Sequence, residues 1–162
     1  MDKFFILGLP RSRTYWLSQF LGCMHEGLYY YPDYRLFMES EHIGDSTTCY
    51  TGIKDYITNY KKVIIHRKEE EVIASLTHVF GENDYSFIEN DALILKEEQG
   101  LHVMFNDINE RLPEIWRFCR NESYDIDRSN ELIRKRLENK FMISETMRII
   151  HANQGSPQDS AK

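Results

Sequence analysis

The sequence predicts an α/β fold in which helices cover both faces of a central, mainly parallel sheet, giving three layers. Two observations support this prediction. Residues 4–7 and 63–65 are runs of consecutive apolar residues, and each run leads through an arginine-bearing turn into a helical pattern. Continuous apolar runs are typical of strands buried on both faces, as in parallel sheets. Strands that alternate with helices indicate a layered α/β domain.

The first half of the chain is expected to supply two strand–helix units. Residues 14–21 predict a helix that buries Leu17, Phe20 and Leu21 and ends at Gly22. Residues 29–51, rich in aromatic residues, Gly, Asp and Ser, predict loops with one short strand. After the second strand, residues 69–79 predict a helix whose glutamates suit its positive end.

The second half predicts one more strand and three helices. We expect helices at residues 90–98 and 113–120, the latter with Pro113 at an early position. Residues 101–105 predict the third strand. A last helix over residues 127–137 is expected to be capped by Asp127.

Length and composition set the broad class. The 162 residues suit one domain, residues 1–150, followed by a disordered tail at residues 151–162. A net charge of −6 argues against a nucleic-acid partner. An odd number of cysteines without a C-x-x-C pair argues against a zinc site and for a reducing compartment. With no signal peptide and no apolar run of about 20 residues, we expect a cytoplasmic protein without a membrane partner.

The turn after the first strand indicates an anion site. A helix N-terminus presents free N–H groups, and Arg11 and Arg13 add positive charge. A Walker A loop counted from Gly8 would carry Gly, Lys and a Mg²⁺-binding hydroxyl where this chain has Arg13, Thr14 and Tyr15. These differences argue against an enzyme that uses Mg·ATP or Mg·GTP. The alternative interpretation is an ordinary strand-to-helix turn.

A second motif gives the anion a more specific identity. Arg67 ends the second apolar strand, and Ser75 follows eight positions later. Residues 10–16 (PRSRTYW) and 63–76 together resemble the sulfotransferase superfamily. The first is similar to its 5′-phosphosulfate loop, P-[KR]-S-G-T-[ST]-x, and the second to its 3′-phosphate motif. The resemblance implies a P-loop NTPase-like fold in a short, bacterial or phage member of that superfamily.

The same resemblance implies a donor and roles for individual residues. The donor would be 3′-phosphoadenosine 5′-phosphosulfate (PAPS), with 3′-phosphoadenosine 5′-phosphate (PAP) as product and no metal. Residues implied at the 5′ end are Pro10, Arg11, Ser12, Arg13, Thr14, Tyr15 and Trp16. Arg11 would also contact the transferring sulfuryl group, while Arg67 and Ser75 would hold the 3′-phosphate. Arg13 replaces the usual Gly, and either crowds the loop or adds a second cation. Trp16 either stacks on adenine or packs in the core.

A base must also take the acceptor's proton. The family places a His or a Glu after the first helix, where this chain has His25 and Glu26. The alternative is a solvated His–Glu pair in a loop, and the family's Lys-x-x-His strand pattern is absent. Lys54 and His42 are weaker candidates that are expected at the surface.

Three functions compete. The first is a sulfotransferase acting on a hydroxyl or amine of a small molecule or sugar. The second is a P-loop kinase or nucleotide hydrolase, which Thr14 and Tyr15 disfavour. The third is a non-catalytic binder of PAP or another nucleotide. The tyrosine-rich residues 29–34 either line the acceptor pocket or pack onto the core.

Overall fold

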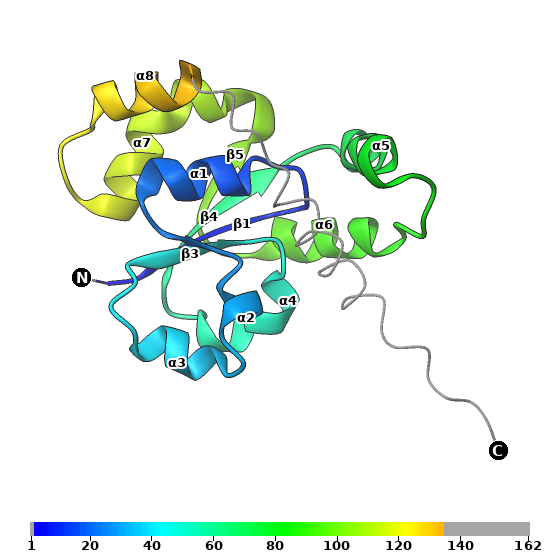
Figure 1. Ribbon diagram of the computed structural model, residues 1–162, viewed down its shortest axis with the longest axis horizontal. Helices are drawn as coiled ribbons and strands as arrows, with labels where there is room; N and C mark the ends of the chain where they lie inside the picture. The colour runs from blue at the N-terminus through cyan, green and yellow to red at the C-terminus, as the bar shows by residue number, and fades with distance from the viewer. Residues whose placement is uncertain (1, 135–162) are drawn as a thin grey trace.

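A computed structural model describes residues 2–134, which contain a five-stranded sheet with helices on both faces (Figure 1). The strands are β1 (Phe4–Gly8), β2 (Met24–His25), β3 (Gly44–Thr47), β4 (Lys61–His66) and β5 (Leu101–Met104). Their order is β2-β3-β1-β4-β5, and every pairing is parallel. The predicted α/β fold class is therefore confirmed.

The helices form two groups, one on each face of the sheet. They are α1 (Thr14–Leu21), α2 (Gly27–Tyr30), α3 (Tyr34–Glu39), α4 (Tyr50–Ile53), α5 (Glu69–Phe80), α6 (Phe87–Glu97), α7 (Ile108–Arg120) and α8 (Ile126–Arg134), with short 3₁₀ turns η1 (Lys54–Tyr56) and η2 (Phe105–Asp107). Figure 1 shows α1, α7 and α8 together on one side of the sheet, with α2, α3 and α4 on the other.

The core is divided between these two faces because side chains alternate along each strand. Phe4 and Ile6 of β1 pack with α1 and α7, whereas Phe5 and Leu7 pack with α3, α5 and α6. All four side chains are fully buried. This burial on both faces accounts for the continuous apolar runs by which the strands were predicted.

Several local predictions agree with the structure. Helix α1 has the predicted bounds, and Gly22 caps it in the left-handed conformation with φ 70°. Strand β4 ends immediately before Arg67, and α5 follows it directly. Helix α6 begins three residues earlier than predicted, at Phe87.

The expectation for residues 29–51 was right about one short strand, which is β3, and wrong in treating the rest of the segment as loops. This segment includes α3, β3 and parts of α2 and α4. The Asp33 side chain caps α3 by accepting the Arg35 N–H at 3.0 Å, and Tyr34 and Phe37 are buried beneath it. Packing of these aromatic side chains stabilises a helix that is too short to be stable by propensity alone.

Two further helix boundaries differ from the prediction. Helix α7 begins at Ile108, so Pro113 lies inside it rather than in its first turn. Burial of Ile115 and Trp116 on the same helix offsets the missing proline N–H. Helix α8 is capped by Asp125, which accepts the Arg128 N–H at 2.8 Å, and not by Asp127. The predicted tail at residues 151–162 lies outside the described residues.

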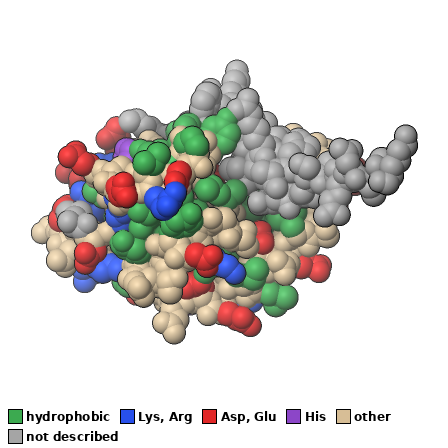
Figure 2. Space-filling view, turned by 90° about the horizontal axis from the view of Figure 1, so that it is seen from below, with side chains coloured by type: hydrophobic (Ala, Val, Ile, Leu, Met, Phe, Trp, Pro, Cys, Tyr) green, Lys and Arg blue, Asp and Glu red, His purple; other side chains and the backbone are tan. Residues whose placement is uncertain are grey.

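Two further observations concern the distribution of surface charge and the length of the helices. On the face seen from below, acidic and basic side chains are interspersed, with apolar side chains exposed between them (Figure 2). None of the helices within residues 2–134 is both long and apolar enough to cross a membrane.

Candidate functional site

The loop between β1 and α1 contains residues 10–13, the turn that the sequence predicts to bind an anion. We call it the anion loop. Arg11 and Arg13 both adopt the left-handed conformation, with φ 64° and 62°. Such angles are unfavourable for residues other than glycine, and residues that adopt them cluster at functional sites. The loop therefore turns sharply enough to place the N-terminus of α1 at the carboxyl edge of the sheet.

Unpaired donors lie in this loop. Ser12 is fully buried, and its hydroxyl has no hydrogen-bond partner among the described residues. Thr14, the first residue of α1, is also buried, and no side chain caps the helix. Buried polar groups are nearly always hydrogen-bonded in native proteins, so the orphaned Ser12 hydroxyl fits a loop that receives a ligand with acceptor oxygens.

The predicted 5′ and 3′ residues meet beside this loop. Strand β4 pairs with β1, so that Gly8 lies opposite Ile65 and the two strands end together. Arg11 Nε donates to Ser75 Oγ at 3.2 Å, and Arg67 Nη1 donates to the Arg11 carbonyl at 2.5 Å. We call Arg11, Arg67 and Ser75 the arginine cluster.

The arginine cluster concentrates positive charge. Burial and then the neighbouring Arg67 charge lower the pKa of Arg11, although a guanidinium stays protonated at neutral pH. Arg67 also lies over the Phe105 ring, 4.3 Å from its centroid, and contacts Glu71 at 3.4 Å. Two like charges held this close favour an anion between them.

Arg13 points out of the anion loop. Its Nη1 donates to Asn109 Oδ1 of α7 at 2.8 Å, and its guanidinium lies 4.4 Å from the centre of the Trp16 ring. Arg13 thus replaces a glycine at a left-handed position without filling the loop. Trp16 in turn stacks on Phe20 and donates its indole N–H to the Leu132 carbonyl at 3.2 Å. These contacts correspond to the core-packing alternative for Trp16.

His25 and Glu26 lie at the end of β2 and are buried, so their interpretation as a solvated loop pair is wrong. Glu26 is 2% exposed, and its backbone adopts the left-handed conformation with φ 55°. Its Oε2 accepts from Thr47 Oγ1 at 2.8 Å, and its Oε1 accepts from the Thr48 N–H and hydroxyl at 2.9 and 2.8 Å. The His25 side chain is 8% exposed, and its Nε2 lies 3.8 Å from Glu26 Oε1.

Burial shifts the pKa values of these groups in opposite directions. It lowers the pKa of His25 to about 4, so the imidazole is neutral at pH 7. It raises the pKa of Glu26 to about 7, and the negative charge of Asp45 on β3 adds to this rise. The pKa of Asp45 itself is raised to about 6, again mainly by burial. Glu26 thus titrates near neutrality, where a general base works best.

The other residues that the sequence suggested for the site either lie away from Glu26 and the arginine cluster or pack against neighbouring side chains. Lys54 and His42 are exposed, and His42 precedes β3 at the opposite edge of the sheet. Tyr15 packs edge-on against the His25 ring, with centroids 5.4 Å apart. Of the tyrosine-rich residues 29–34, Tyr29 and Tyr30 are exposed and Tyr34 is buried against Phe37.

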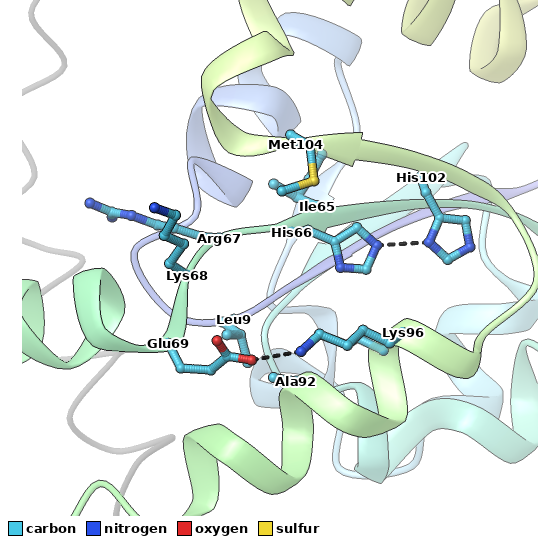
Figure 3. A pocket seen from close by; sticks show the side chains of 11 residues that line it. Leu9, Ile65, His66, Arg67, Lys68, Glu69, Ala92, Lys96, His102 and Met104 are labelled. Atoms are coloured by element: carbon cyan, nitrogen blue, oxygen red, sulfur yellow. Dashed lines mark hydrogen bonds and ion pairs between the residues drawn. The ribbon is translucent and has the colours of Figure 1, made fainter.

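A cavity of about 420 Å³ that sequence reasoning missed lies beside the arginine cluster (Figure 3). Its walls include Leu9, Ala92 and Met104, with the Glu69–Lys96 ion pair at one side. Its volume falls within the range of small-molecule sites.

Two stacked histidines form the polar wall of this cavity. His66 Nε2 lies 2.7 Å from His102 Nδ1, and His102 Nε2 lies 2.9 Å from the Glu98 carbonyl. Because a carbonyl only accepts, His102 Nε2 donates to Glu98. In the sequence, the one feature that pointed to His66 was its position next to Arg67, a predicted site residue.

Comparison with known proteins identifies the fold. The crystal structure of mouse sulfotransferase SULT7A1 complexed with PAP is similar, with a TM-score of 0.52 and 12% sequence identity. The chain has a sulfotransferase-like fold. The match covers 82% of this chain but 63% of the SULT7A1 chain, so this protein spans less than two thirds of that length. No family model matches the sequence. The search of curated proteins finds no match either.

The described residues also bear on metal binding. Within residues 2–134, no group of three or more His, Cys, Asp or Glu side chains is arranged to hold a metal ion.

Proposed function

We propose that this protein is a sulfotransferase that moves a sulfuryl group from PAPS to a hydroxyl or amine of a small molecule or sugar, with PAP as the second product. The observation that carries the proposal is the arginine cluster. Arg11 comes from one motif, and Arg67 and Ser75 come from the other. Arg11 contacts both, because its Nε donates to Ser75 Oγ and its carbonyl accepts from Arg67 Nη1. The sulfotransferase-like fold supports the same conclusion.

The residues present fit the donor. The orphaned Ser12 hydroxyl and the N-terminus of α1 would bind the 5′-phosphosulfate, together with Arg11. Arg67 and Ser75 would bind the 3′-phosphate. The bound donor supplies a sulfuryl group whose bond to the 5′-phosphate oxygen breaks as its bond to the acceptor forms. Arginine and N–H donors stabilise charge on the oxygens, which is the main requirement of such transfers.

Glu26 is the residue that we propose as base. Its Oε2 accepts one hydrogen bond, so a lone pair remains for the acceptor's proton. With its pKa raised to about 7, Glu26 holds a transferred proton more firmly than His25, whose pKa is lowered to about 4.

The test is acceptor-dependent release of PAP. Purified protein is incubated with radiolabelled PAPS, EDTA and a panel of alcohols, phenols, amines and mono- and oligosaccharides. We expect labelled product with at least one acceptor, and loss of at least about 90% of the rate in Arg67→Ala. Arg35→Ala, which removes an exposed arginine, is the matched control and keeps the rate.

Two results would contradict the proposal. Binding of PAP without PAP release for any acceptor would indicate a non-catalytic nucleotide binder. Transfer of phosphate from Mg·ATP, with no use of PAPS, would indicate a kinase.

A further inference from the structure

Asp45 lies on β3 directly behind the bend that carries Glu26. Both of its carboxylate oxygens accept the Gly27 N–H, at 3.0 and 2.9 Å. Its Oδ2 also accepts the Tyr34 hydroxyl at 3.1 Å. Both carboxylate oxygens of Asp45 are thus engaged by groups of the protein itself.

The contact with Gly27 leaves no room for a side chain. A Cβ at Gly27 would lie 2.9 Å from Asp45 Oδ2, closer than such atoms approach in proteins. The preceding residue, Glu26, adopts the left-handed conformation and donates its N–H to the Ser46 carbonyl at 2.9 Å. Asp45 thus holds the second half of a bend that is unfavourable for Glu26. This bend directs the Glu26 carboxylate to Thr47 and Thr48.

We propose that Asp45 is a positioning residue for Glu26, which holds the bend at Glu26 and Gly27 and supplies the negative charge that faces the Glu26 carboxyl. The inference rests on the proposed function, because it takes Glu26 as the base of the sulfuryl transfer. The acceptor's proton goes to Glu26, and Asp45 neither receives it nor contacts the reacting atoms.

The other titratable groups around Glu26 are neutral. His25 of β2 has its pKa lowered to about 4 by burial, so it carries no charge at pH 7. Burial raises the pKa of Tyr34 on α3 and of Cys23 before β2, which keeps both protonated. Asp45 is therefore the charged neighbour of Glu26 among the described residues. Its charge favours the protonated form of Glu26.

The test is the variant Asp45→Asn, studied in the full-length protein. An NMR titration follows the carboxyl carbon of Glu26, and the pH profile of kcat/KM is measured with PAPS and the best acceptor. Loss of the like charge lowers the pKa of Glu26, so the NMR midpoint and the acidic limb should both move down by about one pH unit. Asp55→Asn makes the same change at an exposed carboxylate and should move neither.

A second variant keeps the test valid if Asp45→Asn does not fold. Tyr34→Phe removes one donor to Asp45, so Asp45 ionises less readily and the Glu26 midpoint should fall by a smaller amount. An unchanged Glu26 midpoint in a folded variant would overturn the inference. So would a lower rate with an unchanged pH profile, which indicates a purely structural role. If wild type transfers no sulfuryl group, the proposed function fails, whereas the NMR midpoints still decide whether Asp45 acts on Glu26.

Discussion

The two halves of the carboxyl edge of the sheet handle charge in opposite ways. At the ends of β1 and β4, Arg11 lies in contact with both Arg67 and Ser75, and Glu71 pairs with Arg67, so that two positive charges face one carboxylate among these contacts. At the ends of β2 and β3, Glu26 and Asp45 are withdrawn from water, and burial raises the pKa of both carboxyls. The first half is suited to hold an anion and the second to accept a proton. A group-transfer site needs both, in adjacent positions.

The largest effect is expected at the acidic half. Glu26→Gln keeps the size of the side chain and one acceptor oxygen, replaces the other oxygen with an NH₂ donor, and removes the base. We expect kcat to fall by about 100-fold or more, the usual contribution of general-base catalysis, with PAP affinity changed less than about twofold. Rates come from labelled PAPS and affinities from calorimetry. A full rate in this variant would mean that Glu26 is not the base.

A substitution in the basic half, at the ends of β1 and β4, is expected to weaken the binding of PAP. Ser75→Ala removes a hydroxyl that would donate to the 3′-phosphate, so PAP should bind about tenfold more weakly. The affinity for 5′-AMP, which lacks that phosphate, should not change. Ser86→Ala, at an exposed serine, is the control for calorimetry with both nucleotides. Equal losses for PAP and 5′-AMP would place Ser75 outside the 3′ site.

The pH dependence of the free energy of unfolding should reveal the raised pKa of the buried Glu26 carboxyl. Because the pKa of Glu26 rises from 4.5 to about 7 on folding, the native state binds more protons than the unfolded state between these values. Its contribution to stability is present below pH 4.5 and is lost as the pH rises through 7. Each pKa unit corresponds to about 1.4 kcal/mol, so the loss is roughly 3 kcal/mol.

Urea unfolding of wild type and Glu26→Gln at a series of pH values measures this loss. The two proteins should be about equally stable at pH 4.5, and the variant more stable by roughly 3 kcal/mol at pH 8. The titratable groups other than Asp45, which interacts with Glu26, are common to both proteins and largely cancel. A constant difference across the pH range would contradict the raised pKa.

The smallest effect is expected at Arg13. Arg13→Gly relieves a left-handed residue but loses the contacts with Asn109 and Trp16. These terms offset each other, so the free energy of unfolding should change by less than about 1 kcal/mol. The affinity for PAP, measured by calorimetry, should stay within about threefold. A tenfold loss would mean that Arg13 belongs to the anion site and turns into it when the nucleotide binds.

The fold and the candidate site could be predicted where the site residues belong to one contiguous strand–turn–helix segment. Residues 4–21 combine a buried strand, a polar turn and an amphipathic helix, so both the fold and the anion loop could be predicted there. The resemblance to the 3′-phosphate motif singled out Arg67 and Ser75, which stand eight positions apart on a strand–turn–helix unit. Their contact with Arg11 required only that β1 and β4 be neighbours in a parallel sheet.

The acidic half could not be predicted because its contacts are distant in sequence. Glu26 is buried by Thr47 and Thr48 and held by Asp45, residues about twenty positions away whose pairing depends on β3. Strand β2 has two residues, too few to show a pattern. The stacked His66 and His102 likewise come together only when β5 pairs with β4.

The measurement that tests the central claim most directly is calorimetric titration with PAP in the presence of EDTA, on wild type and Arg67→Ala, with 5′-AMP and Mg·ATP as comparators. The account predicts that wild type binds PAP in the micromolar range without metal and binds 5′-AMP at least about tenfold more weakly. In Arg67→Ala, this preference for the 3′-phosphate should disappear. Tighter binding of Mg·ATP, or an unchanged PAP affinity in Arg67→Ala, would contradict the assignment of the arginine cluster as the donor site.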